Sequence, residues 1–333
     1  MRRRTWARCG AAGAASVVSL GEMADSAVLR PDVLVLAGGG IVGEAWMHGV
    51  LAGLEDGGDV DFREVEAFVG TSAGSIVAAR LAAGRRPPRP DDGAEEPADA
   101  ALAADAEGSD GSPGALRLVA REAARIGWAA TAPVTGVALA LGAPAGGFLR
   151  AALLSRTAGG GRPLTELRRR VDRWGARFDG RLRVCTVDRR TGRRVVFGAP
   201  GAPPAEVADA VCASCAIPWV FSPVRIGDRE YVDGGAWSVT NLDAARTGRG
   251  TQVLCLDPAA ALGGTDRRTA ALRAAFRVAS ELEIQILRRR GTHVLHVAPD
   301  PAATEAMGAN LMSPAHVGGA LAAGYRQGLS LAG

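Results

Sequence analysis

The stretch GTSAG at residues 70–74 decides the fold that this sequence predicts. Val65–Val69 before it is apolar enough for a buried strand, and Ser75–Ala83 after it has the small side chains of a helix that packs close to a sheet. A serine between two glycines, at a turn from strand to helix, is typical of a nucleophile elbow that lifts the hydroxyl above the sheet. The same pattern also occurs as a tight turn without chemistry, so Ser72 is a candidate nucleophile that needs partners.

A second strand-turn-helix unit lies upstream. The apolar run Asp32–Ala37 predicts a buried strand, GGGIVG at residues 38–43 a turn, and Glu44–Glu55 a helix. Two such units in succession predict an α/β fold with its functional groups at the carboxyl ends of the strands.

The turn at residues 38–43 admits two interpretations. It fits the Gly-x-Gly-x-x-Gly pattern of a dinucleotide site, but the nearest acidic residues, Asp59 and Asp61, precede the next strand, whereas such a site needs one after it. Backbone N–H groups of a glycine loop can instead bind the oxyanion of a tetrahedral acyl intermediate, which requires donors without intervening side chains.

The α/β pattern continues after residue 156. Apolar periodicity predicts helices over Leu164–Arg173 and Ala205–Cys215 and a long helix from about Leu272 to Ile286. Strands are predicted at Leu182–Val187, Arg194–Phe197, around Val224 and Tyr231, at Gln252–Leu256 and at Val294–Val297.

A serine nucleophile needs a base, and the sequence offers few. His48 falls on a face of the first helix that we expect to pack, while His293 and His296 point to opposite faces of one strand. His316 is the one histidine left as a triad candidate. The alternative is Asp233, which follows a strand and precedes two glycines, and whose carboxylate can take the serine proton directly. A solvated Asp-Gly turn remains the simpler interpretation of that residue alone.

Four motifs give the chain a resemblance to bacterial patatin-like phospholipases over about Asp32–Asp243 and, more loosely, beyond it. They are the glycines of residues 38–43, GTSAG at 70–74, CASCAIP at 212–218 and DGG at 233–235. Each motif is common, but their joint order and spacing are specific. The resemblance implies a three-layer α/β/α sandwich with a mostly parallel central sheet, and substrates among acyl lipids.

The resemblance also implies a Ser-Asp dyad without histidine, and no metal or cofactor. Ser72 would attack an ester carbonyl while Asp233 accepts its proton, and a water activated by Asp233 would then release the acyl group. The amides of Gly38, Gly39 and Gly40 would hold the oxyanion. The supporting glycines of the motifs would be Gly43, Gly70, Gly74, Gly234 and Gly235.

One residue departs from the family pattern. Family members usually carry Arg or Lys immediately before the last glycine of the first motif, where this chain has Val42. Its absence puts recognition of a phospholipid headgroup in doubt and favours a neutral acyl ester. Ester cleavage itself does not depend on it, because backbone N–H groups supply the oxyanion donors.

Composition excludes several classes of protein. With 47% hydrophobic and 22% charged residues, the chain is too apolar for a disordered protein and too mixed for a polytopic membrane protein. A net charge of only +4, without any lysine, makes no case for a nucleic-acid partner. The cysteines are odd in number and mostly lie in apolar runs, which predicts free core thiols in a reducing compartment; they are Cys9, Cys185, Cys212, Cys215 and Cys255.

We expect a disordered tail over residues 1–30, with Met1 or Met23 as the start, and one catalytic domain over 31–333. An insertion at 85–154 divides into a flexible acidic and proline-rich loop, 85–114, and a helical cap, 115–154. The uncharged stretch 127–149 of the cap has the length of a membrane span but contains prolines and glycines, and a packed hairpin is a further alternative. We predict a cytoplasmic protein whose cap makes peripheral membrane contact.

The sequence thus predicts a serine lipid acyl hydrolase of phospholipase A, lysophospholipase or esterase type, which forms an acyl-enzyme. Two alternatives stay open. One is a serine hydrolase or acyltransferase that pairs Ser72 with His316, and the other is a nucleotide-binding protein that uses the glycine loop.

Overall fold

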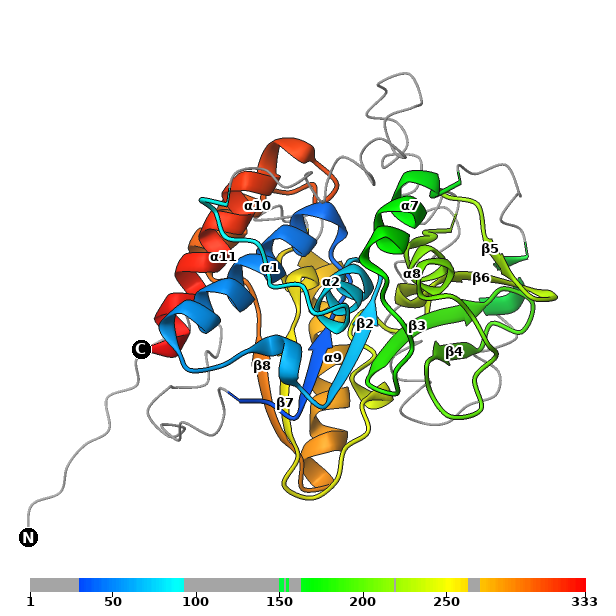
Figure 1. Ribbon diagram of the computed structural model, residues 1–333, viewed down its shortest axis with the longest axis horizontal. Helices are drawn as coiled ribbons and strands as arrows, with labels where there is room; N and C mark the ends of the chain where they lie inside the picture. Colours follow the sequence, from blue (N-terminus) through cyan, green and yellow to red (C-terminus); the bar gives the residue numbers. More distant parts are fainter. Residues whose placement is uncertain (1–29, 93–149, 153, 156–162, 219, 263–269) are drawn as a thin grey trace, which may run out of the picture.

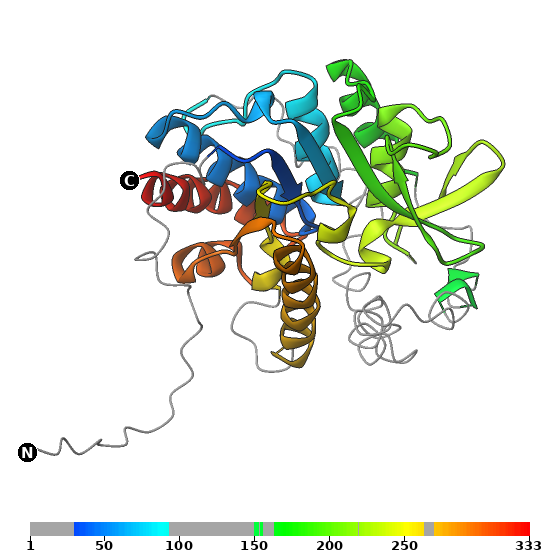
Figure 2. The same ribbon diagram turned by 90° about the horizontal axis from the view of Figure 1, so that it is seen from below.

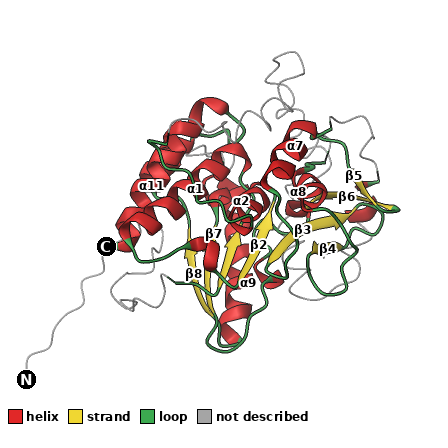
Figure 3. Ribbon diagram, in the orientation of Figure 1, coloured by secondary structure: helices red, strands yellow, loops and turns green. Residues whose placement is uncertain are grey.

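Eight strands form one sheet at the centre of the structure (Figures 1 and 3). The computed structural model describes residues 30–92, 150–152, 154–155, 163–218, 220–262 and 270–333. The strands are β1 (Val33–Leu36), β2 (Ala67–Thr71), β3 (Leu182–Asp188), β4 (Arg194–Phe197), β5 (Val224–Ile226), β6 (Arg229–Asp233), β7 (Gln252–Leu256) and β8 (His293–Val297). The α-helices are α1 (Gly40–Gly57), α2 (Ala73–Ala82), α7 (Thr165–Trp174), α8 (Val207–Cys215), α9 (Ala270–Arg289), α10 (Pro301–Met307) and α11 (Val317–Ala332).

The sheet is mostly parallel, as predicted. Its strand order is β5-β6-β3-β2-β1-β7-β8, with β4 paired to β3 outside this path. Strands β3, β2, β1, β7 and β8 are parallel to one another, whereas β4, β5 and β6 join antiparallel at one side. The carboxyl ends of β1 and β2 are therefore adjacent, which brings the two glycine motifs together.

Alternate residues of the central strands pack into two separate apolar layers, one on each face of the sheet. Leu34, Leu36 and Phe68 face one layer, which contains residues of α1, α2, α7, α8 and α11. Val33 and Val35 face the other, which contains residues of α9. Figure 2 shows α9 on the opposite side of the sheet from α1 and α2. The architecture is the expected three-layer α/β/α sandwich.

The first and last helices are joined by close backbone contact. Gly49 and Gly53 of α1 face α11, and Gly324 and Gly328 of α11 face α1, so that the two helices interdigitate without side chains between them. A Cβ atom on Gly53 would lie 2.2 Å from the Tyr325 carbonyl oxygen. The helices lie side by side along their length in Figure 1.

We expect Gly53→Ala to destabilise the protein by about 1–3 kcal/mol, although alanine is the better helix former, because its methyl group has no room against the α11 backbone. Gly318→Ala in the first turn of α11 is the matched control, since nothing lies within 4 Å of the added Cβ. Urea unfolding of both variants measures the difference. A Gly53→Ala protein as stable as Gly318→Ala would contradict the close packing.

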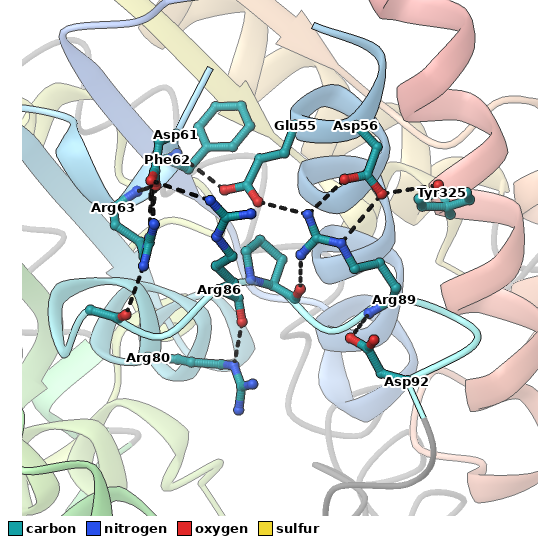
Figure 4. A network of polar contacts seen from close by, with 12 residues as sticks. Glu55, Asp56, Asp61, Phe62, Arg63, Arg80, Arg86, Arg89, Asp92 and Tyr325 are labelled. Atoms are coloured by element: carbon teal, nitrogen blue, oxygen red, sulfur yellow. Dashed lines mark hydrogen bonds and ion pairs between the residues drawn. The ribbon is translucent and has the colours of Figure 1, made fainter. Parts of the chain in front are cut away.

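Polar contacts fix the segment that follows α2 on the outer end of α1 (Figure 4). The Arg89 guanidinium donates hydrogen bonds to Glu55 Oε2 at 3.1 Å and Asp56 Oδ1 at 2.7 Å. Tyr325 of α11 donates its hydroxyl to Asp56 Oδ2 at 3.0 Å. Residues 85–92, predicted as the beginning of a flexible loop, therefore make specific contacts with α1.

The remainder of that predicted loop and nearly all of the predicted helical cap, residues 93–149, lie outside the described residues, as does the amino-terminal tail up to residue 29. Within the described part, α1 begins at Gly40, four residues earlier than predicted, and α10 was not predicted. Four cysteines in the described ranges are buried and free, which confirms the prediction for Cys185, Cys212, Cys215 and Cys255. No described helix combines the length and apolar character that crossing a membrane requires.

Candidate active site

Ser72 lies at the sharp turn between β2 and α2. Its backbone has φ 51° and ψ −125°, a conformation that side-chain-bearing residues rarely adopt. The two flanking glycines make this turn possible, because a Cβ on Gly70 would lie 2.5 Å from Ser75 Cα and one on Gly74 would lie 2.0 Å from the Leu36 carbonyl oxygen. The strained serine stands at the amino-terminal end of α2, where the helix dipole favours negative charge.

Strand register brings Asp233 to the level of Ser72. β3 lies between β2 and β6, pairing Thr71 with Cys185 on one side and Asp233 with Thr186 on the other. The residue after Thr71 and the last residue of β6 therefore meet above β3. The Ser72 hydroxyl lies close enough to the Asp233 carboxylate to lower the pKa of that carboxyl.

The Asp233 carboxyl is buried, with 5% of the residue exposed. Burial raises its pKa to about 6, while the hydrogen bond donated by the Gly235 N–H, at 2.6 Å from Oδ1, and the nearby Ser72 hydroxyl act in the opposite direction. A carboxylate with this pKa is ionised at neutral pH and is a stronger base than a solvated aspartate. Such a group is suited to general-base catalysis.

The glycine loop lies beside Ser72. A Cβ on Gly38 would be 3.4 Å from Ser72 Cβ, and one on Gly39 would be 2.4 Å from Pro258 Cγ. Gly40 has φ +61° and begins α1, with the Leu311 carbonyl oxygen 2.5 Å from where its Cβ would be. Neighbouring atoms thus exclude a side chain at Gly39 and Gly40, and at Gly40 the backbone conformation does so as well, whereas a Cβ on Gly38 would make an ordinary van der Waals contact with Ser72.

The three amides of this loop differ in what they contact. The Gly38 N–H donates to the Val239 carbonyl oxygen at 3.0 Å. No partner within the described residues is recorded for the N–H groups of Gly39 and Gly40, which lie at the amino-terminal end of α1. Two helix amino termini, those of α1 and α2, therefore meet at Ser72.

Val42, at the position where the family usually has a basic residue, has a fully buried side chain in the apolar layer around α1. Its N–H donates to the Leu311 carbonyl oxygen at 3.0 Å. Valine at this place serves packing and contributes no charge.

Ser214 of α8 is a residue to which the sequence alone assigned no role. Its Oγ accepts the Ser72 N–H at 2.8 Å and donates to the Cys185 carbonyl oxygen at 2.7 Å. Two residues later, the Ala216 carbonyl oxygen accepts the Asp233 N–H at 3.0 Å. The end of α8 thus holds the backbone of both Ser72 and Asp233, which explains the CASCAIP motif. A serine four residues before a proline gave no signal of this role.

We expect Ser214→Ala to cost about 1–3 kcal/mol of stability and to lower kcat at least tenfold, because the Ser72 N–H loses its acceptor beside the strained turn. Ser75→Ala is the matched buried-serine control. The Ser72 carbonyl oxygen that accepts the Ser75 hydroxyl also accepts the Ser75 N–H, so no group is left unpaired. Thermal unfolding and steady-state kinetics test the pair, and equal effects of the two substitutions would contradict a specific role for Ser214.

The histidines lie apart from this dyad. His48 is buried in α1, as expected, and His316 packs on Gly308 with its Nδ1 3.1 Å from the Ala306 carbonyl oxygen. His296 contacts Asp257 at 3.2 Å. No contact of a histidine with Ser72 or Asp233 is recorded in the described ranges, and no three His, Cys, Asp or Glu residues of those ranges are grouped closely enough to hold a metal ion.

Residues 34–246 match the protein-family model described as patatin-like phospholipase. This range is more than half of the 333 residues and contains all four motifs. The chain belongs to the patatin-like phospholipase family. Family membership supports lipid acyl hydrolase activity in general.

Among solved structures, VipD from Legionella pneumophila resembles this patatin-like chain with a TM-score of 0.44 and 16% sequence identity. The similarity covers 91% of this chain and 66% of the VipD chain, so the patatin-like chain spans slightly less than two thirds of VipD. A search of the curated proteins found no match.

Proposed function

We propose that this protein hydrolyses carboxylic esters of acyl lipids through Ser72 and Asp233. The observation that carries the proposal is the placement of a strained serine beside a buried carboxyl at the ends of β2 and β6. The proposal adds to the family assignment a nucleophile, a base and a set of oxyanion donors in this chain.

In the acylation step, the Asp233 carboxylate accepts the Ser72 proton as Oγ attacks the ester carbonyl carbon. The carbonyl π electrons move to oxygen and give a tetrahedral oxyanion. Collapse of this intermediate re-forms the carbonyl and breaks the bond to the alkoxy oxygen, which takes the proton from Asp233 and leaves as the alcohol. The acyl group is then bound to Ser72 as an ester.

In the deacylation step, a water gives its proton to Asp233 and attacks the acyl carbonyl carbon. The second tetrahedral intermediate collapses, the bond to Ser72 Oγ breaks, and the proton held by Asp233 returns to Oγ. The carboxylic acid leaves, and the dyad is restored. The same carboxyl acts as base and then as acid in each half of the cycle.

The oxyanion donors in this proposal are the N–H groups of Gly39 and Gly40. Both lie at the amino-terminal end of α1 without a recorded partner in the described residues, while the Gly38 N–H already donates to Val239. Gly38 instead provides the close approach of the loop to Ser72. Donors fixed by the backbone stabilise the developing charge without reorganisation.

The substrate class follows from the family and from Val42. The family assignment supports acyl lipids, and a buried valine in place of a cation removes one means of attracting a lipid phosphate. We therefore propose that neutral acyl esters are cleaved at least as well as anionic phospholipids.

The test uses purified full-length protein, a fluorophosphonate probe and three substrates: a short-chain nitrophenyl ester, a monoacylglycerol and an anionic phospholipid. We expect turnover of the nitrophenyl ester and monoacylglycerol, and a probe adduct on the peptide that contains Ser72, identified by mass spectrometry. An adduct on another residue, or no hydrolysis of any ester, would overturn the proposed function.

A further inference from the structure

The loop between Asp233 and β7 contains a second strained residue. Asn241 has φ +49° and ψ 35°, and it and Ser72 are the non-glycine residues with positive φ in the described part of the chain. Asn241 is completely buried. A buried polar residue in the left-handed conformation destabilises the fold unless its side chain makes compensating hydrogen bonds. The hydrogen bonds of Asn241 therefore indicate what the residue does.

The Asn241 carboxamide contacts a residue next to each member of the proposed dyad. Its Nδ2 donates to Thr71 Oγ1 at 3.1 Å, and Thr71 is the residue before the nucleophile. Nδ2 also donates to the carbonyl oxygens of Ser238 and, at 3.4 Å, of Gly234, the residue after the base. One amide group thus joins the turn at Ser72 to the turn at Asp233.

The other side of the Asn241 amide is fixed as well. Its Oδ1 accepts a hydrogen bond from Arg194 at 3.1 Å, and this guanidinium also pairs with Asp243 through two hydrogen bonds. Glu283 of α9 accepts hydrogen bonds from the Thr240 hydroxyl at 2.7 Å and the Leu242 N–H at 2.8 Å, on either side of Asn241. The Arg194 hydrogen bond to Oδ1 therefore fixes the orientation of the amide, while the Glu283 hydrogen bonds hold the flanking residues of the loop on α9.

This contact lies on the opposite face of the sheet from Ser214. Val69 and Cys185 pack in the α9 layer, and Thr71, two residues after Val69, is on the same face. Ser214 and Ala216 hold the dyad backbone from the α8 side. The Ser72 turn is therefore held from both faces of the sheet.

We propose that Asn241 is a positioning residue that sets the distance between Ser72 and Asp233 by joining Thr71 to Gly234. The expected change in kcat rests on the proposed hydrolysis, whereas the expected change in the geometry of Ser72 and Asp233 does not. The same loop reaches the glycine motif too, since the Val239 carbonyl oxygen accepts the Gly38 N–H at 3.0 Å. Loosening the loop thus displaces base and oxyanion loop together.

Asn241→Gly is the decisive variant, because glycine tolerates the positive φ while the side chain and its hydrogen bonds are removed. We expect kcat to fall about 100-fold with KM changed less than threefold, since a misplacement of about 1 Å can cause such a loss. Thr240→Val is the matched control: it removes a buried hydrogen bond of the same loop that reaches neither Thr71 nor Gly234. A kcat loss in Thr240→Val equal to that in Asn241→Gly would overturn the proposal.

The positioning role can also be tested without enzymatic turnover, through the pKa of Asp233. The nearby Ser72 hydroxyl lowers the pKa of Asp233, so we expect a displaced Ser72 to raise that pKa further. We expect a carboxyl ¹³C NMR titration, with the signal assigned by its loss in Asp233→Asn, to show a higher Asp233 pKa in Asn241→Gly and the wild-type pKa in Thr240→Val. An unchanged pKa in a folded Asn241→Gly protein would refute the positioning role.

Thr71→Val keeps the proposal testable if Asn241→Gly does not fold. It removes the acceptor Oγ1 with little change in volume, and we expect the same direction of pKa shift and kcat change; an unchanged pKa and kcat would refute the role. A wild-type protein without esterase activity but with these pKa shifts would refute the proposed function and support the positioning role.

Discussion

Ser72→Ala is expected to lower the rate of ester hydrolysis by about 10⁴- to 10⁶-fold and to abolish labelling by a fluorophosphonate. The acyl-enzyme cannot form without the hydroxyl, and the remaining oxyanion donors and substrate binding give only residual catalysis. The measurement is the initial rate with a nitrophenyl ester, compared with the intact mass after treatment with the probe.

Ser330→Ala, an exposed serine on α11, is the control for this prediction. It should keep wild-type rate and labelling. The stability of a second variant tests the backbone strain at this position. Because residue 72 has positive φ, we expect Ser72→Gly to be more stable than Ser72→Ala by about 1 kcal/mol. Labelling that persists in Ser72→Ala would remove Ser72 as the nucleophile.

Asp233→Asn is expected to lower kcat by at least 10³-fold, because an amide cannot accept the serine proton. In the wild-type protein the carboxylate must be ionised, so kcat/KM should rise with pH through a midpoint near the pKa of about 6. The residual activity of Asp233→Asn should lack this rise. A wild-type profile that is flat between pH 5 and 7 would contradict Asp233 as the base.

The same substitution should stabilise the fold at high pH. Folding raises the pKa of Asp233 from its usual value near 3.8 to about 6, so the folded state binds the proton more tightly than the unfolded chain. The stability that the neutral carboxyl provides is present below about pH 4 and is lost as the pH rises through about 6. At pH 8 the buried charge costs up to about 3 kcal/mol.

Asp233→Asn removes that charge at every pH, so its free energy of unfolding should exceed the wild-type value by up to about 3 kcal/mol at pH 8 and by only about 1 kcal/mol at pH 4.5. Urea unfolding at the two pH values measures the difference. A gain that is the same at both pH values would show that the effect does not arise from the buried charge.

Local patterns were sufficient to predict the strand-turn-helix units and the fold class. The turn at residues 70–74 is predicted correctly because a tight turn requires particular residues: glycine is needed at 70 and 74, where a Cβ would collide with neighbouring backbone. The apolar runs of β1, β2 and β7 are likewise local signals of buried parallel strands.

What the sequence did not reveal depends on contacts between distant residues. Ser214 accepts the Ser72 N–H across 142 positions, and Asn241 reaches Thr71 across 170. A single serine or asparagine in a loop has no periodicity from which such a partner can be inferred. The donation of the Gly38 N–H to Val239, which leaves Gly39 and Gly40 as the proposed donors, depends on tertiary packing in the same way.

The glycine-lined pairing of α1 with α11 has a consequence for folding during translation. Its contacts span much of the chain, with Trp46 donating its indole N–H to Gln327 across 281 positions. At translation rates of about 5–20 residues per second, roughly 10–50 s pass between the synthesis of the two helices. Throughout that interval the face of α1 that packs on α11 has no native partner and is open to a chaperone that recognises nascent apolar segments.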